Sequence, residues 1–358
     1  DLVLTRQVLL RFAVLHELVD RDHRQALGFA KLIGKAPARS AKRDLAREVD
    51  AVYLWVNDQD PQWKAKRAQF RPTGETKVAA SASRFRQFNE LLTSIKLLAV
   101  NAPFIRNVYV VVDDQQPNLA SLGHDLPFEI VLVNHSEFIP EKFLPTFNSR
   151  AITAHLHLIP GLSERFLYLN DDVFIGRSSV VEDWFDGDKI RTRFTETRFP
   201  AAETLAENEV LYRARWKAVG LAKAKGWSVD DRMPEHAPYP LTKTIMQKLW
   251  SEFPAELAET ASSKFRTAEA ILPELLAFYL AAGNQLALPA SNSSYKYVPM
   301  NEASAIMPLI DLALKPGRFL TLCLNDVSEV AADNQINEMA LARRYARTLR
   351  FLEATAAK

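Results

Sequence analysis

The chain has 358 residues, of which 48% are hydrophobic and 25% charged, and its formal net charge is +2. This length exceeds the roughly 250–300 residues at which a single core stops growing, so we expect one large core with an appended or inserted piece. The near-neutral charge excludes a general polyanion-binding field, and the single cysteine, Cys323, excludes an intrachain disulfide framework and a cluster of metal-binding thiolates. A lone cysteine also fits a reducing, cytoplasmic location.

Residues 1–48 are expected to form a helical arm and linker before the main domain. Apolar residues recur there at the spacing of an amphipathic helix: Val8, Phe12, Leu15 and Val19. Between residues 21 and 47, eight Lys or Arg residues stand against two Asp residues. Two interpretations stay open, a peripheral contact with the acidic inner face of a membrane or a solvated helix face. The apolar seam also allows self-association into a homo-oligomer. No apolar run approaches the roughly 18 residues of a membrane span.

Four short apolar runs follow, and their Val, Ile, Tyr and Phe content is typical of strands buried on both faces. Each run ends in acids or amides: AVYLWVND (51–58), NVYVVVDD (107–114), FEIVLVNH (128–135) and RFLYLNDD (165–172). Helical patterns lie between them, one at 85–98 and one that Asn148 or Ser149 caps. Alternating strands and helices predict an α/β, Rossmann-like fold with a mainly parallel sheet and flanking helices. Such sheets bind ligands outside the carboxyl ends of their strands.

The apolar run at 165–176 is interrupted by Asn170, Asp171 and Asp172. On a regular strand, neighbouring side chains point to opposite faces, so two adjacent acids share a face only if the strand ends there and turns. A strand end above a ligand crevice would let at least one carboxylate reach a metal ion or a phosphate. An Asp-Asp pair equally fits the cap of a turn, and the residues by themselves leave both interpretations open.

Several nucleotide-binding classes are excluded by missing motifs. Glycine accounts for 11 of the 358 residues, well below the usual ~7%, and neither G-x-G-x-x-G nor G-x-x-x-x-G-K-[ST] occurs. The G-x-S-x-G elbow of serine hydrolases is absent as well. What remains for phosphate chemistry is a set of carboxylates with a divalent cation, together with Arg, Lys and His.

Four blocks in order along the chain resemble the Stealth family of hexose-1-phosphate transferases, which includes bacterial capsule polymerases and the lysosomal-enzyme N-acetylglucosamine-1-phosphotransferase. The blocks are DAVYLWVNDQDPQW (50–63), the stretch from SRFRQFNE (83–90) to NDDVFIG (170–176), EHAPYPLTKTIMQKLW (235–250) with SSKFRT (262–267), and FLTLCLNDV (319–327). The chain differs from residues common in the family at Asn57-Asp58, at Gln87-Phe88 and at Leu92.

The resemblance implies a glycosyltransferase-type catalytic domain over residues 49–358 and a reaction in capsule or exopolysaccharide synthesis. A sugar hydroxyl attacks the phosphate next to the hexose of a UDP-sugar, UMP leaves, and a phosphodiester joins the acceptor saccharide to the hexose. In this interpretation Arg266 and His236 hold the transferred phosphoryl group, and either His236 or an aspartate of the pair serves as general base.

The resemblance also implies a set of site residues. The catalytic residues would be Asp171, Asp172, His236 and Arg266. A divalent cation, Mg²⁺ or Mn²⁺, would be bound by Asp171, Asp172 and Asp326. Substrate contacts would come from Trp55, Asn57, Asp58, Arg84, Glu90, Asn148, Ser149, Asn170, Lys243 and Asn325.

Residues 177–235 resemble an insertion whose basic and aromatic residues form either an acceptor-binding surface for a phosphodiester polymer or a solvated helix face. No nucleic-acid-binding motif is present, so we expect no nucleic-acid partner. Two other functions stay open. One is a metal-dependent nucleotide-sugar glycosyltransferase that releases UDP, and the other is a non-catalytic carbohydrate-binding protein. The released nucleotide distinguishes the three functions. We expect the protein in the cytoplasm, where it could also lie against the inner face of the membrane.

Overall fold

The computed structural model describes residues 49–70, 85–123, 125–206, 209–290, 294–315, 317–326 and 336–356. They belong to a compact unit that spans Ala46–Lys358. The expected arm at 1–48 and the expected substrate residue Arg84 lie outside the described residues. The roles of the arm in membrane contact and self-association therefore stay predictions. Within the described part of the chain, no helix combines the length and the apolar character needed to cross a bilayer.

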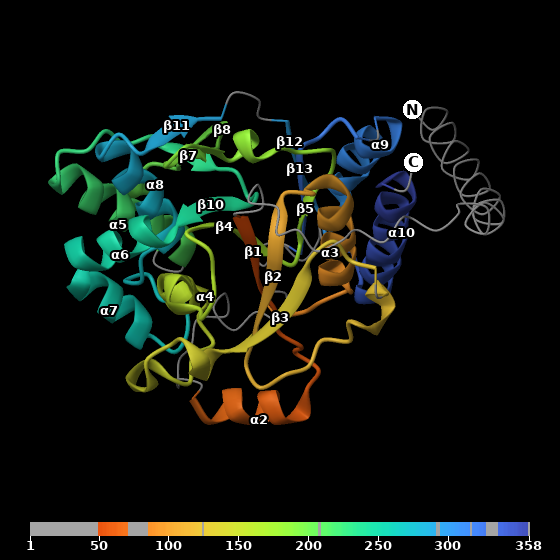
Figure 1. Ribbon diagram of the computed structural model, residues 1–358, viewed down its shortest axis with the longest axis horizontal. Helices are drawn as coiled ribbons and strands as arrows, with labels where there is room; N and C mark the ends of the chain where they lie inside the picture. The colour runs from red at the N-terminus through yellow and green to blue at the C-terminus, as the bar shows by residue number, and fades with distance from the viewer. Residues whose placement is uncertain are drawn as a thin grey trace, which may run out of the picture. The chain divides into compact units, whose positions relative to one another are not determined.

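A five-stranded sheet with the order β10-β4-β1-β2-β3 forms the centre of the unit (Figure 1). Its strands are β1 (Val49–Leu54), β2 (Ile105–Val112), β3 (Glu129–Asn134), β4 (Arg165–Asn170) and β10 (Tyr239–Thr242). The first four run parallel, and β10 is antiparallel to β4. The predicted strands and the mainly parallel α/β fold are confirmed. Each strand ends before the last polar residues of its run, so these residues lie in loops at one edge of the sheet.

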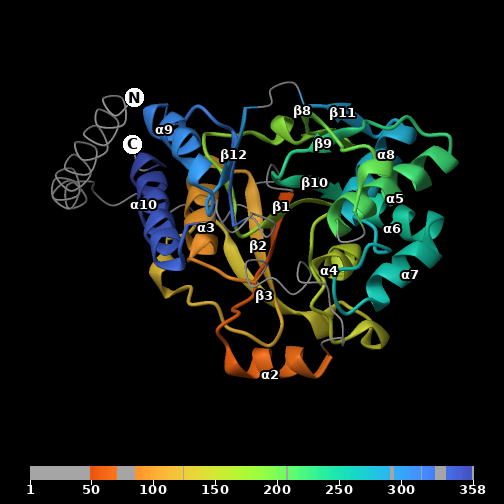
Figure 2. The ribbon, with the colours of Figure 1, turned by 180° about the vertical axis from the view of Figure 1, so that it is seen from behind.

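Helices cover both faces of this sheet, which explains why its strands carry near-continuous apolar sequence. In the two opposite views, α3 and α10 lie on one side of the sheet and α4, α6 and α7 on the other (Figures 1 and 2). The helices are α2 (Pro61–Phe70), α3 (Glu90–Asn101), α4 (Ser149–His155), α5 (Val210–Ala224), α6 (Lys243–Glu252), α7 (Pro254–Ser262), α8 (Pro273–Gly283), α9 (Ile306–Leu314) and α10 (Glu338–Ala356). Short 3₁₀ turns are η2 (Ala120–Leu122), η3 (His135–Glu137), η4 (Glu141–Phe143), η5 (Leu156–Leu158), η6 (Val181–Asp183), η7 (Ala202–Thr204) and η8 (Ala303–Ala305).

The chain passes from the central sheet into a second sheet at Asp171 and Asp172. After this turn, β5 (Val173–Ile175) pairs antiparallel with β13 (Thr321–Asn325), which pairs parallel with β12 (Tyr295–Pro299). The Ser94 hydroxyl on α3 donates to the Val173 carbonyl at 2.6 Å and lies 2.8 Å from the Tyr53 hydroxyl on β1. The apolar run 165–176 is therefore two strands of two sheets, and the acids occupy the turn between them.

The segment 177–235 shares the main hydrophobic core. It forms β6 (Phe185–Asp186), β7 (Lys189–Thr192), β8 (Phe194–Arg198), α5 and β9 (Arg232–Pro234). Strand β7 pairs with β6 and with β11 (Ala287–Pro289), and β8 pairs with β9. Trp184, Phe185 and Ala218 belong to the same buried cluster as the central strands. This segment is thus packed into the domain, with β7 paired to β11 and α5 in contact with α8, rather than set apart from it.

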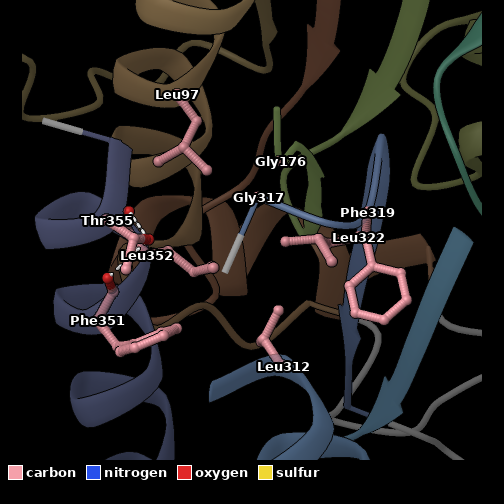
Figure 3. A pocket seen from close by; sticks show the side chains of 9 residues that line it. All are labelled: Leu97, Gly176, Leu312, Gly317, Phe319, Leu322, Phe351, Leu352 and Thr355. Atoms are coloured by element: carbon pink, nitrogen blue, oxygen red, sulfur yellow. Dashed lines mark hydrogen bonds between the residues drawn. The ribbon is translucent and has the colours of Figure 1, made fainter. Parts of the chain in front are cut away.

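A small apolar recess lies where α3, α9 and α10 meet the second sheet (Figure 3). Leu97, Leu312, Leu322 and Phe351 line it, and none of the lining residues has a titratable side chain. A Cβ atom on Gly176 would lie 2.7 Å from the Phe319 carbonyl oxygen, so glycine is needed for this close approach. The recess reflects packing between layers and carries no chemistry.

Candidate active site

The loops after β1, β2 and β4 meet at the carboxyl edge of the central sheet. Leu54 pairs with Val111 on one side and with Asn170 on the other, which places the residues that follow these strands beside one another. The Asn57 amide nitrogen donates to the Gln115 side chain at 2.9 Å, and this side chain donates back to the Asn57 carbonyl at 2.9 Å.

Three expected substrate residues lie in the first of these loops. Trp55 follows β1 directly, and its amide donates to the Val111 carbonyl at 3.1 Å. Asn57 is joined to the loop after β2, while the Asp58 carboxylate accepts a hydrogen bond from the Gln59 side chain at 3.0 Å. Trp55, Asn57 and Asp58 are all partly exposed at the edge where Asn170 ends β4.

His236 is the centre of a polar network that joins residues distant in sequence. Its Nε2 atom lies 2.7 Å from Asn170 Nδ2, and its Nδ1 atom lies 3.3 Å from Asn325 Nδ2. A neutral imidazole has one acceptor nitrogen, so one of the two amides must be turned to present its oxygen to the ring. The His236 backbone amide donates to the Tyr295 hydroxyl at 3.1 Å. Three expected site residues, Asn170, His236 and Asn325, are thus brought together.

Asp172, the second of the two adjacent acids, lies beside this histidine. Asp172 Oδ1 is 3.9 Å from His236 Nε2, and it is a buried oxygen without a hydrogen-bond partner among the described residues. Burial raises the pKa of Asp172 to about 7. Burial, followed by the charge of Asp172, raises the pKa of Asp171 to about 7 as well. Among the described residues, neither carboxylate forms an ion pair with a Lys or Arg side chain, which is the arrangement expected of a site that receives a cation.

Cys323 on β13 lies beneath Asp172 and His236. Its sulfur is 3.6 Å from Asp172 Oδ2 and 3.4 Å from His236 Nδ1, and the residue is fully buried. Each of the three side chains offers one potential ligand atom, and these three atoms lie within 4.8 Å of one another. This part of the site can therefore hold a divalent cation.

Two more acids border the pair. Glu90 is buried at the start of α3 and accepts a hydrogen bond from the Phe88 amide. Burial, followed by the charge of Asp171, raises the pKa of Glu90 well above its ordinary value. Asp326 Oδ2 accepts hydrogen bonds from Nε and Nη2 of Arg86 at 2.8 and 2.5 Å. Asp326, expected as a metal ligand, is thus already paired with a cation of the chain, and only its buried Oδ1 has no partner in the described structure.

Two arginines act on His236 through their charges. Arg266, in the loop after α7, donates from Nη2 to the Ser149 hydroxyl at 2.7 Å. Arg215 projects from α5, with Nη1 2.9 Å from the Met233 sulfur. Burial, followed by the charges of Arg215 and Arg266, lowers the pKa of His236 to about 4. At neutral pH the imidazole is therefore uncharged.

Arg215 is a site residue that the sequence did not single out. It was only one of eleven Lys and Arg residues in the segment 177–235. Its guanidinium carbon lies 5.6 Å from the centre of the Phe199 ring and 5.3 Å from that of Tyr212. Burial lowers its pKa, and in the part of the chain that the structure describes it forms no ion pair with an acid. A partly buried arginine that forms no direct ion pair among the described residues can bind an anion of the substrate.

The other basic residues of this segment are largely engaged within the chain. Arg191, Arg198, Lys217 and Lys225 form ion pairs with Asp186, Asp231, Glu259 and Glu252. Arg213 donates to the Ala206 and Leu205 carbonyls, and Arg193 lies over the Trp184 ring. The expected acceptor-binding surface is therefore much less charged than the sequence indicates.

Two expected substrate residues have other surroundings. The Asn148 side chain caps α4 by accepting from the Arg150 amide at 3.1 Å, and it donates to the Ser263 carbonyl at 3.1 Å. Thr242 pairs with Arg165 at the amino-terminal end of β4, which places Lys243 at the edge of the sheet opposite Asn170. Lys243 Nζ lies 3.5 Å from the Leu162 carbonyl. Asn148 is a structural cap, and the structure does not bring Lys243 to the site.

Three conserved regions of one family match this chain. Stealth conserved region 1 matches residues 47–75, conserved region 2 matches 84–193, and conserved region 3 matches 235–276. The chain belongs to the Stealth family. Asn170 and Asp172 lie in the second conserved region of this Stealth protein, and His236 lies in the third. Arg215 lies between the second and third regions.

Named relatives of this Stealth protein act in polysaccharide synthesis. An exopolysaccharide phosphotransferase of Streptomyces coelicolor is 35% identical over 83% of this chain and 55% of its own length. The capsular polysaccharide phosphotransferase LcbA of Aeromonas hydrophila is 28% identical over 83% of this chain and 84% of its own. The chain spans about half or less of the length of the Streptomyces coelicolor relatives it matches. The solved structure of mouse xyloside xylosyltransferase 1 is 10% identical, with a TM-score of 0.40, over 79% of this chain and 99% of its own.

Proposed function

We propose that this Stealth protein transfers hexose-1-phosphate from a UDP-sugar to a hydroxyl group of an oligosaccharide or polysaccharide. The observation that carries the proposal is the surroundings of the uncharged His236 imidazole, where Asp172 Oδ1 lies 3.9 Å from Nε2 and the charges of Arg215 and Arg266 also act on the ring. A diphosphate with a bound divalent cation has complementary charges, since the cation is attracted to the acids and the phosphates to the arginines. The names of the relatives, which are phosphotransferases of exopolysaccharide and capsule, support the same reaction class.

The acidic side fits a hard cation such as Mg²⁺ or Mn²⁺. Asp171 and Asp172 offer carboxylate oxygens, and Asp172 Oδ1 is buried without a partner in the described structure. Oxygen ligands of this kind are those that Mg²⁺ prefers. When bound, the cation would neutralise phosphate oxygens of the donor. Arg86 takes one oxygen of Asp326, so we assign the metal mainly to the Asp171–Asp172 pair.

The basic side fits the phosphate that is transferred. Charge spreads over the equatorial oxygens of phosphorus in the transition state, and fixed cations stabilise it there. Arg266 is held by its hydrogen bond to Ser149, and Arg215 is held by aromatic rings. Because these contacts fix the guanidinium groups in advance, little reorganisation is needed when charge develops.

We assign the general base to His236. Carboxylates that bind a cation lose much of their basicity, which argues against Asp171 and Asp172 in this role. The imidazole is uncharged at neutral pH and its ring is held by Asn170 and Asn325. It would accept the proton of the acceptor hydroxyl as oxygen attacks phosphorus, and the bond between phosphorus and the UMP oxygen would break.

The decisive test identifies the nucleotide product. The protein is incubated with a panel of UDP-sugars, Mg²⁺ and oligosaccharide acceptors, and the donor carries ¹⁸O in the bridge between hexose and phosphate. Phosphoryl transfer releases unlabelled UMP and leaves the label in the saccharide product. Labelled UDP would instead identify a glycosyltransferase, and absence of any released nucleotide across the panel would favour a carbohydrate-binding protein.

A further inference from the structure

The side chains of Asp172, His236 and Cys323 come from three separate parts of the chain, and one potential ligand atom of each lies within 4.8 Å of the other two. The Cys323 sulfur is 3.4 Å from His236 Nδ1 and 3.6 Å from Asp172 Oδ2. Zinc bonds of about 2.3 Å to sulfur and 2.0–2.1 Å to nitrogen or oxygen give tetrahedral edges of about 3.5 Å. These two contacts therefore already have the separation that a shared zinc ion requires.

We propose that Asp172, His236 and Cys323 form a binding site for a thiophilic divalent cation such as Zn²⁺, and that its occupation switches the active site off. The binding site stands on the geometry of these three residues. The inhibition rests on the function proposed above, because it assumes that Asp172 and His236 act in the reaction.

Ligand chemistry separates this site from the one for Mg²⁺. Mg²⁺ selects oxygen ligands, whereas a set of one thiolate, one imidazole and one carboxylate is typical of zinc. Burial, followed by the charge of Asp172, raises the pKa of Cys323 well above its ordinary value, so the thiol keeps its proton while no soft metal is bound. When the cation binds, the sulfur–hydrogen bond breaks, the proton passes to solvent and a metal–sulfur bond forms.

Asn170 can orient the histidine for this role. A histidine that binds a metal through one ring nitrogen usually donates the N–H of the other to an oxygen. With the Asn170 amide turned so that its oxygen faces Nε2, the ring donates there and directs the Nδ1 lone pair toward Cys323. The Asn325 amide nitrogen near Nδ1 agrees with this tautomer, since it would then face an acceptor.

The ion can reach the site, and its arrival removes two functional groups at once. The side chains of His236 and Asp172 are 30% and 19% exposed. One bound zinc ion would occupy the imidazole nitrogen next to the reacting groups and a carboxylate assigned to Mg²⁺. Because Mg²⁺ has little affinity for thiolate, excess Mg²⁺ would not displace it.

A cadmium titration tests the site without any turnover assay. Cys323 is the sole cysteine of the 358 residues, so a cadmium–thiolate charge-transfer band in the ultraviolet reports on this position alone. We expect one equivalent of Cd²⁺ to produce the band in the wild-type protein in the presence of excess Mg²⁺. The Cys323→Ser variant should lose the band, and His236→Ala and Asp172→Asn should each weaken Cd²⁺ binding at least about tenfold.

The matched control is His135→Gln. His135 Nδ1 lies 3.8 Å from Asp113 Oδ1, so it is also a buried histidine beside an acid, but no thiol accompanies it among the described residues. This variant should bind Cd²⁺ like the wild type. Absence of the band in the wild type, or a band of unchanged affinity in both His236→Ala and Asp172→Asn, would overturn the site.

Turnover with Zn²⁺ then tests the inhibition. We expect Zn²⁺ to abolish wild-type nucleotide release and a chelator to restore it, whereas Cys323→Ser should need at least about tenfold more Zn²⁺ relative to its own zinc-free rate. If the protein binds Cd²⁺ but Zn²⁺ does not change its turnover, the proposed inhibition is wrong. A protein that releases no nucleotide at all would defeat the proposed function, and with it the inhibition, while the cadmium titration would still decide the binding site.

Discussion

The side-chain amide of Asn170 lies 2.7 Å from Nε2 of His236 and so joins two parts of the chain that are 66 residues apart. Asn170 ends β4, and His236 lies in the turn before β10. Because β4 and β10 are paired, the sheet itself holds these two loops in register. The ring orientation of the proposed base is thus set by the central sheet rather than by its own loop.

Asn170→Ala should separate positioning from folding. Loss of the amide frees the His236 ring, so we expect the turnover number to fall about 10²-fold, with a smaller change in KM, because a misplaced base affects the chemical step. The pH–rate profile should also shift, which a purely structural role would not produce. Asn148→Ala is the matched control, since loss of a helix cap costs about 1 kcal/mol of stability. Similar effects of both variants on turnover would contradict the positioning role.

Asp172→Asn should make the protein more stable at neutral pH and inactive. The folded state keeps the Asp172 proton up to about pH 7, whereas the unfolded chain releases it near its ordinary value of 3.8. The folded state therefore binds more protons in this window, and the contribution of Asp172 to the free energy of unfolding falls as pH rises from about 4 to 7. Asparagine has no ionisable carboxyl group, so the free energy of unfolding of Asp172→Asn does not fall in this way.

Thermal unfolding without divalent cations at pH 5 and pH 8 measures the effect. The excess melting temperature of Asp172→Asn over the wild type should be larger at pH 8 than at pH 5. Burial lowers the pKa of His135 to about 4, so buried histidines of this kind change the stability in the opposite direction as pH rises. Their contribution is the same in both proteins and cancels when the two melting temperatures are compared. A variant less stable than the wild type at pH 8 would show that Asp172 is compensated by contacts other than those seen here.

Arg215→Met should impair turnover without destabilising the fold. Removing one fixed cation from a charged transition state typically costs about 10²–10³ in rate. The buried guanidinium has no ion pair within the described structure, so replacing it with an apolar chain should keep or raise the melting temperature. Arg198→Met is the control, because Arg198 lies on β8 with a side chain that is 70% exposed and pairs with Asp231. Equal rates for both variants would remove Arg215 from the site.

His236→Ala and Arg266→Ala should each lower turnover by about 10²–10³. Arg266 donates a hydrogen bond to the Ser149 hydroxyl at 2.7 Å, and the His236 side chain is 30% exposed. Lys243→Ala provides the comparison at the opposite edge of the sheet and should keep the wild-type rate. Loss of activity in Lys243→Ala would show that the substrate extends to that edge.

The sequence by itself determined the strands and the acids that end them. Apolar runs such as residues 107–112 can be stable only between two covering layers, so they predicted a parallel sheet and its polar carboxyl edge. The turn at Asp171 and Asp172 followed from the alternation of side chains along a strand. These are local properties, since they depend on neighbouring residues and their periodicity.

The tertiary structure alone decided which distant residues share the site. Arg215 and Lys217 both lie on α5 and look alike in sequence, yet the charge of Arg215 acts on His236 whereas Lys217 pairs with Glu259. Lys243 belongs to the same sequence block as His236 but lies at the far edge of the sheet because β10 runs antiparallel to β4. Cys323 meets His236 only because β13 pairs with β5. Strand direction and layer packing depend on the whole chain, and no local pattern of residues carries that information.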